Sequence, residues 1–249
     1  APYLPIVWGG DPTTAWGFDG LRSAVTEGLS MGLSGIGIWA TDIGGFFSLG
    51  EQRLSEELLI RWIQLGALLP VMRTKSAGVS IPISERPQIW DSSILPHWRR
   101  WASLHTRLNP YLMAAAREYV ETGMPVMRHL VLTHPEDEVA TGLEDQYLLG
   151  PDLLVAPVLE EGGRSRRLYL PAGRWADAWT GTAHEGPAWL EVAAPLDLAP
   201  VLIREGAEVP LLSADVMTLT DYGEGSVVRL ADRPGPGELV RYPGPLPLM

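Results

Sequence analysis

The sequence contains no cysteine among its 249 residues. This absence excludes disulfide bonds and thiolate chemistry, although it leaves the redox compartment open. No apolar run is long enough to cross a bilayer. The formal net charge of -11 disfavours nucleic acid, whose phosphates select basic surfaces, and it disfavours anionic membranes. We therefore expect neither a nucleic-acid partner nor a membrane partner.

Signatures of several other chemistries are missing or misplaced. The five histidines, at positions 97, 105, 129, 134 and 184, lack metal-ligand spacing. Residues 35–37 lack the third glycine of a dinucleotide-binding loop. Residues 28–32 match a serine-nucleophile pattern, but they fall at the end of a predicted helix instead of between a strand and a helix. We expect no metal and no cofactor, and a serine-dependent α/β hydrolase is the least favoured class.

The chain begins with Ala1 instead of methionine, and its first residues lack the basic start and apolar core of a signal peptide. We interpret Ala1 as an internal position of a longer polypeptide, whose targeting signal would lie outside this sequence. Localisation stays open, with a cytoplasmic location favoured.

The first half of the chain alternates strand-like and helix-like patterns. Short apolar runs predict three strands, at residues 5–8, 34–39 and 68–72. Asp19 and Ser55 are expected to cap the helices that follow the first two strands. A long amphipathic helix from Trp98 should kink at Pro110 and end at Gly123. This order predicts parallel strands with right-handed crossovers.

The second half is predicted to be an antiparallel β domain. Short β-type runs, at 152–159, 166–170, 189–193 and 201–204, are separated by glycine-rich turns. From about Ser213 this pattern weakens, and we expect little regular structure in the proline- and glycine-rich end.

Asp11, Asp42 and Lys75 follow the three predicted parallel strands at intervals of 31 and 33 positions. A strand with its returning helix takes roughly 30 residues, so these side chains should lie on one rim of the sheet. In α/β barrels this rim holds the active site.

Asp11 follows Trp8 and two glycines, which allow a tight turn and close approach of a ligand. Burial beside the indole would raise the pKa of the carboxyl, as a general acid near neutral pH requires. The alternative is that Asp11 and Pro12 only begin a turn.

Asp42 lies between Trp39 and Phe46, where it can accept hydrogen bonds from sugar hydroxyls while a ring stacks below. Its alternative is a loop cap.

Four segments, at 8–23, 35–46, 61–73 and 145–158, resemble glycoside hydrolase family 31 in order and spacing. The resemblance spans roughly Val7 to Leu212. It implies an α/β plus β fold. Residues 1–123 would be the C-terminal portion of a (β/α)8 TIM barrel, with strands six to eight, and residues 124–212 a small antiparallel β-sandwich domain. Residues 213–249 would be a loosely structured tail or the start of a further domain.

The resemblance also implies retaining hydrolysis of α-glycosides by two carboxylates. Asp11 matches the acid/base, and the nucleophile is expected on an earlier strand, before residue 1, so that this chain alone would be inactive and poorly stable. The expected partner is a carbohydrate, and self-association stays open. Six residues are candidates for substrate binding: Trp8, Trp39, Asp42, Phe46, Arg73 and Lys75. A salt bridge to a carboxylate is the favoured role of Arg73.

Lys75 departs from the family pattern, in which many members carry histidine at this position. A lysine donates as a flexible point charge and cannot accept a hydrogen bond. An anionic sugar, sulfonated or uronic, is therefore one hypothesis for the substrate. A second class of function is a non-catalytic carbohydrate-binding or structural member of the same fold.

Overall fold

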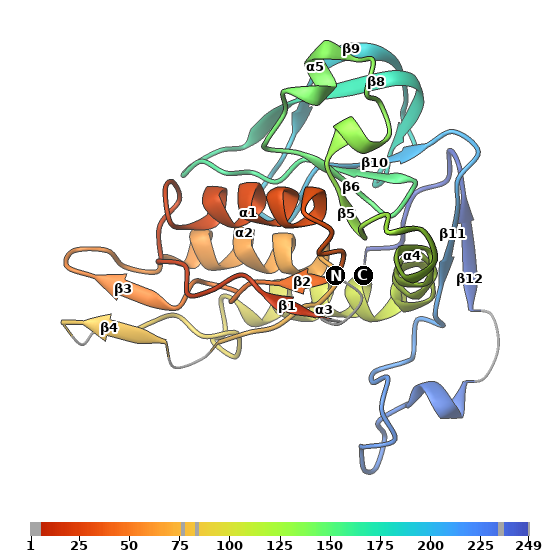
Figure 1. Cartoon of the computed structure of the whole chain (residues 1–249). Helices are drawn as coiled ribbons and strands as arrows, with labels where there is room; N and C mark the ends of the chain where they lie inside the picture. Colours follow the sequence, from red (N-terminus) through yellow and green to blue (C-terminus); the bar gives the residue numbers. More distant parts are fainter. Residues whose placement is uncertain (1–5, 76–77, 83–84, 234–236, 249) are drawn as a thin grey trace.

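The computed structural model of the chain describes residues 6–75, 78–82, 85–233 and 237–248. Its first part is an α/β layer, with β1 (Val7–Trp8) and β2 (Trp39–Ala40) paired in parallel. The helices α1 (Leu21–Leu33) and α2 (Glu56–Ala67) lie on the same side of these strands in Figure 1. A parallel bridge between Ile43 and Thr74 continues the pairing to the third segment. The predicted parallel order is confirmed.

Two predicted strands were wrongly bounded, in each case beside a helix end. Residues 34–36 close α1 instead: the amide of Ile36 donates to the carbonyl of Met31, and Gly35 has a positive φ. The pairing with β1 begins only at Ile38, whose carbonyl accepts from the amide of Val7. The run 68–72 is no strand, because Leu68 and Leu69 continue from α2 in turns and are fully buried. A short apolar run cannot distinguish a strand from a buried helix end. Pro5, the predicted start of the first strand, lies outside the described residues.

The helix signals were mostly read correctly. The hydroxyl of Ser55 accepts from the amide of Leu58 and caps α2, as predicted. The long helix is divided into α3 (Leu95–Arg107) and α4 (Asn109–Thr122), with Pro110 in the first turn of α4 and Gly123 ending it in a left-handed conformation. Asp19 does not cap α1. Gly20 holds that position, and Asp19 has a φ of 60°.

The second part is built around one six-stranded antiparallel sheet, and two strands of it are long. Its strands are β5 (Met127–Arg128), β6 (Tyr147–Leu149), β7 (Leu153–Val155), β8 (Ser165–Asp177), β9 (Ala183–Ala193) and β10 (Val201–Arg204). They lie in the order β5-β6-β7-β10-β8-β9. Between β5 and β6 come the 3-10 turn at Leu130–Leu132 and the short helix α5 (Glu138–Thr141). The antiparallel β domain predicted for this half is confirmed.

The C-terminal region contains more regular structure than its composition predicted. A strand β12 (Glu238–Arg241) pairs in antiparallel fashion with β11 (Glu208–Leu211), beside α4 (Figure 1). A 3-10 turn also forms at Leu230–Asp232. Val240 explains the correction, because it is buried in the main core and gives this polar segment an apolar anchor. Residues 234–236, in the proline-glycine run, lie outside the described part.

The two parts are joined through the buried guanidinium of Arg61 on α2. It donates to the carbonyls of Gly163, Ala194, Pro195 and Leu198 in the β domain and to the side chain of Gln64, at 2.7–3.1 Å. Burial lowers the pKa of Arg61 to about 10, so the side chain stays charged at neutral pH. These backbone acceptors replace the water that the charge has lost.

Candidate active site

Backbone hydrogen bonds join three chain segments into one rim. The amide of Phe46 donates to the carbonyl of Pro12 at 2.7 Å, so the second segment is tied to the first. The amide of Ile43 donates to the carbonyl of Arg73 at 3.2 Å, and the amide of Val79 donates to the carbonyl of Phe46 at 2.7 Å. The segments that carry Asp11, Asp42 and Lys75 therefore form one continuous edge, as the strand spacing predicted.

Asp42 is the most buried acid on this rim, with 2% of its surface exposed. Its Oδ1 atom has no hydrogen-bond partner in the described part of the chain, and the nearest cation is Nε of Arg73 at 4.0 Å. Burial raises the pKa of Asp42, an effect that Arg73 and Lys75 oppose. A buried acceptor without a donor is costly unless another group supplies one. The carboxylate is thus suited to accept a hydrogen bond from a hydroxyl group of a ligand.

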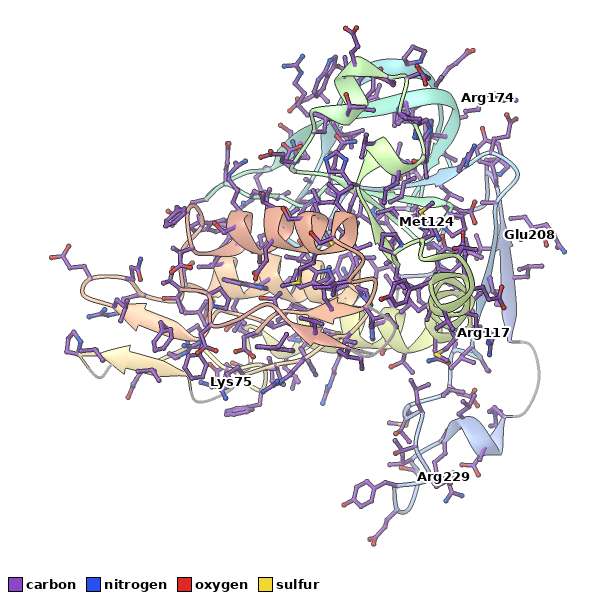
Figure 2. The ribbon with its side chains drawn as sticks, in the orientation of Figure 1. Lys75, Arg117, Met124, Arg174, Glu208 and Arg229 are labelled. Atoms are coloured by element: carbon purple, nitrogen blue, oxygen red, sulfur yellow. The ribbon has the colours of Figure 1, made fainter. Side chains whose placement is uncertain are left out.

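Two cation–aromatic contacts border this carboxylate. The guanidinium carbon of Arg73 lies 4.2 Å from the centre of the Trp8 ring, and Nζ of Lys75 lies 4.8 Å from the centre of the Phe46 ring. Both distances are within the range of a cation–π interaction. Figure 2 shows Lys75 near β4 (Val79–Ile81), far from the labelled residues of the β domain. The rim therefore combines aromatic faces with both signs of charge.

Asp11 is exposed and adjoins a hollow of about 240 Å³, which Pro12, Phe18, Asp19 and Glu27 also line. Its charge raises the pKa of Asp42, which indicates that the two carboxyls are close enough to interact. Burial also raises the pKa of Glu27, and repulsion from Asp19 adds to this effect. The side of the rim that carries Asp11 is therefore rich in acid.

Trp39, a candidate for substrate binding, is not on this surface. Its ring is 1% exposed, and its indole N–H points to the sulfur of Met127 at 3.2 Å. A Cβ added at Gly28 of α1 would lie 2.0 Å from the ring. The ring therefore packs against α1. Successive residues of a strand face opposite sides of the sheet, so Trp39 can face the helices while Asp42, which lies beyond the end of β2, belongs to the rim. Trp39 has no exposed face in this structure, so its burial gives no support to the predicted contact with substrate.

Arg86 is a rim residue that sequence reasoning missed. Its guanidinium donates to the carbonyls of Gly44, Gly45 and Phe46, at 3.3, 2.7 and 3.2 Å respectively. Burial lowers the pKa of Arg86, and the charge of Asp42 opposes this. No motif surrounds this arginine, so the sequence alone carries no signal for it. The structure shows that Gly78 makes room for its guanidinium: Gly78 has φ +58, and a Cβ there would lie 2.2 Å from Nη1 of Arg86.

Neither a metal site nor a membrane span emerges from the described ranges. No group of three or more histidine, aspartate or glutamate side chains there could hold a metal ion. None of the helices described is both long and apolar enough to cross a membrane.

Comparison with known proteins first defines a class, that of barrel glycosidases with a C-terminal β domain. The model of the glycosyl hydrolases family 31 TIM-barrel domain matches residues 2–115, and that of the family's C-terminal domain matches residues 123–208. The chain belongs to glycoside hydrolase family 31. Its first part is part of the family's barrel, and the antiparallel β domain follows it.

Individual relatives agree with this assignment. The chain is 39% identical to a sulfoquinovosidase of Escherichia coli over 87% of its length, which is 32% of that protein. It is 32% identical to an α-xylosidase of Saccharolobus solfataricus, covering 92% of this chain and 31% of that one. Among solved structures, a family 31 sulfoquinovosidase from E. rectale with an aza-sugar inhibitor matches with TM-score 0.75 and 31% identity, over 82% of this chain and 30% of that one. The chain thus spans about a third of these relatives.

Proposed function

We propose that this chain supplies the acid/base and much of the sugar-binding rim of a retaining α-glycosidase. The observation that carries the proposal is the rim itself, where the exposed Asp11 and the buried Asp42 share one edge with two cation–aromatic pairs, and Oδ1 of Asp42 has no hydrogen-bond partner among the described residues. Asp11 would protonate the leaving oxygen and then activate water, while a second carboxylate attacks the anomeric carbon. That nucleophile would come from the part of the relatives that this chain does not cover. In domain terms, residues 1–123 carry the rim and residues 124–212 support it.

Asp42 is not proposed as the nucleophile. Its single short-range cation and its unpaired Oδ1 suit a hydrogen-bond acceptor for a sugar hydroxyl. Trp8 and Phe46 would supply the aromatic walls against which the apolar face of a sugar ring packs. Arg73 would hold the carboxylate of Asp42 in place, and Lys75 would face the substrate.

Asp11→Asn tests the acid/base role in a polypeptide that includes the complete barrel. Glycosides with poor leaving groups should lose far more activity than those with good ones, because only poor leaving groups need protonation at the glycosidic oxygen. Azide should restore turnover of good leaving groups by attacking the glycosyl-enzyme in place of activated water. Equal loss on both kinds of substrate would remove Asp11 from the role. Asp19→Asn, at a neighbouring carboxyl of the same hollow, is the matched control.

Lys75 favours an anionic sugar within this class of substrate. Arg73, Lys75 and Arg86 place three positive charges around Asp42, which would attract a sulfonate or carboxylate on the ring. The sulfoquinovosidases among the relatives support this choice. Hydrolysis of anionic and neutral aryl α-glycosides should differ in favour of the anionic ones, and Lys75→Ala should reduce the difference. An equal preference that Lys75→Ala does not change would contradict it.

The non-catalytic alternative is separated from this function by the same experiments. A complete barrel that binds sugars but shows no turnover with any activated α-glycoside would favour it.

A further inference from the structure

We propose that Arg86 is a positioning residue that fixes the spacing between Asp11, Asp42 and Lys75 by clamping the loop Gly44–Phe46. This inference rests on the proposed function for its activity arm, but its structural arm is independent of it. It assigns to Arg86 an effect on substrate binding that is exerted entirely through backbone carbonyls.

The clamped loop has little structure of its own. Gly44 and Gly45 both have positive φ, at 87° and 72°, and they lie between Ile43, which bridges to Thr74, and Phe47, the first residue of β3 (Phe47–Leu49). The guanidinium of Arg86 spans three successive carbonyls of this loop with two of its nitrogens. A planar, charged fork donates to several acceptors in a fixed geometry, which an ammonium group cannot reproduce.

The loop is also the centre of the rim. Phe46 donates its amide to Pro12, next to Asp11, and its carbonyl accepts from both Val79 and Arg86. One residue therefore connects the acid/base segment to the segment that follows Lys75. Movement of Phe46 would therefore change its distances to both of these segments at once. It would also move the Phe46 ring, which Nζ of Lys75 contacts.

The place for the guanidinium is closely shaped. Gly78 lies against Nη1, and a Cβ at that position would approach it to 2.2 Å and the carbonyl of Phe46 to 2.7 Å. Among the described residues, Nε of Arg86 is buried without a hydrogen-bond partner, so the side chain loses one hydrogen bond to reach the three carbonyls. That cost is unnecessary for a surface arginine and indicates that its position is specific.

Arg86→Lys is the central variant, since it keeps the charge and removes the fork. We expect KM for the preferred glycoside to rise about 10- to 100-fold, because displacement of a binding group by about 1 Å has effects of this size. The kcat should fall as well, because the segment of Asp11 is tied to Phe46 and moves with it, whereas a uniform loss of binding would raise KM alone. Amide hydrogen exchange of residues 42–48 and 78–82 should accelerate in the same variant.

Arg61→Lys is the matched control. Arg61 is buried, whereas Arg86 is partly buried, and it donates to four backbone carbonyls that lie in the β domain, away from the rim. This variant should lose stability without a change in KM or in exchange at the rim loops. If Arg86→Lys does not fold, Arg86→Gln, which keeps a planar donor but loses the charged fork, should produce the same increase in KM and exchange.

The outcomes separate the two proposals. An unchanged KM and unchanged exchange in the folded Arg86→Lys variant would overturn the clamp. The exchange measurement does not depend on enzymatic activity. Absence of glycosidase turnover in the wild-type protein would therefore overturn the proposed function, while the comparison of exchange between the wild type and Arg86→Lys would still decide the clamp. A KM increase of the same size in Arg61→Lys would also refute the inference, since it would show a general loss of stability.

Discussion

Removing the guanidinium of Arg61 tests whether the barrel part and the β domain behave as one cooperative unit. Arg61→Met removes a donor from the carbonyls of Gly163, Ala194, Pro195 and Leu198. Gly163 keeps a donor in Arg164 and Pro195 keeps one in the amide of Leu198, so Ala194 and Leu198 are the carbonyls left without one in the described part of the chain. A buried acceptor left unsatisfied costs about 1–3 kcal/mol, so the two together amount to at least about 2 kcal/mol. Typical domains are stable by only about 5–15 kcal/mol, so the variant should lose a large part of its stability.

Urea denaturation of the complete protein, followed by circular dichroism and by tryptophan fluorescence, measures this loss. Arg174→Met is the comparison, because Arg174 forms an exposed ion pair with Glu205 at 2.8 Å and projects from β8 in Figure 2. Exposed pairs contribute at most about 1 kcal/mol. If Arg61→Met lost no more stability than Arg174→Met, the carbonyls would not depend on Arg61, and its role as the connection between the parts would be wrong.

Three further substitutions, the last with a control variant, have expected outcomes. Burial raises the pKa of Asp42 above its unfolded value of about 3.9, so keeping the side chain ionised costs the folded state free energy at pH 7. Asp42→Asn should therefore raise the Tm at pH 7 while abolishing sugar binding. The gain in Tm should vanish below a pH of about 3.9, where the carboxyl is protonated in both the folded and the unfolded state. Tyr111→Phe removes a hydroxyl that donates to Leu149 and accepts from the amide of Asp152, and should cost about 1–3 kcal/mol in chemical denaturation. Gly28→Val forces a side chain against the ring of Trp39 and should lower the free energy of unfolding by about 1–3 kcal/mol or more in the same denaturation assay. Gly162→Ala is its control: the added Cβ meets open space, so this variant measures only the cost of the positive φ.

The rim was accessible from sequence because it depends on chain length between strands. One β-α unit of ordinary size separates Asp11 from Asp42, and another separates Asp42 from Lys75. The structure joins their segments by hydrogen bonds through Phe46 and Ile43. Their chemical roles stay predictions. The acid/base role of Asp11 in particular rests on the family resemblance and on its place at this rim.

Other features depend on tertiary packing, which a local pattern does not record. The direction of the Trp39 ring is decided by the space above Gly28, a residue on a different element. Arg86 joins the rim because its guanidinium donates to three carbonyls that are far from it in sequence. Likewise, β12 forms because Val240 reaches the core, although the residues around it are polar.

Trp8 has a practical consequence as a natural optical reporter. The guanidinium of Arg73 lies 4.2 Å from its ring, whereas Trp39, Trp62, Trp101 and Trp175 are enclosed and insulated from solutes. A solute that shifts Arg73 must alter the electric field at the Trp8 indole, and with it the emission of that residue. Titrating the protein with sugars while following the emission difference between the parent and Trp8→Phe would therefore give occupancy at the rim without any chromogenic substrate.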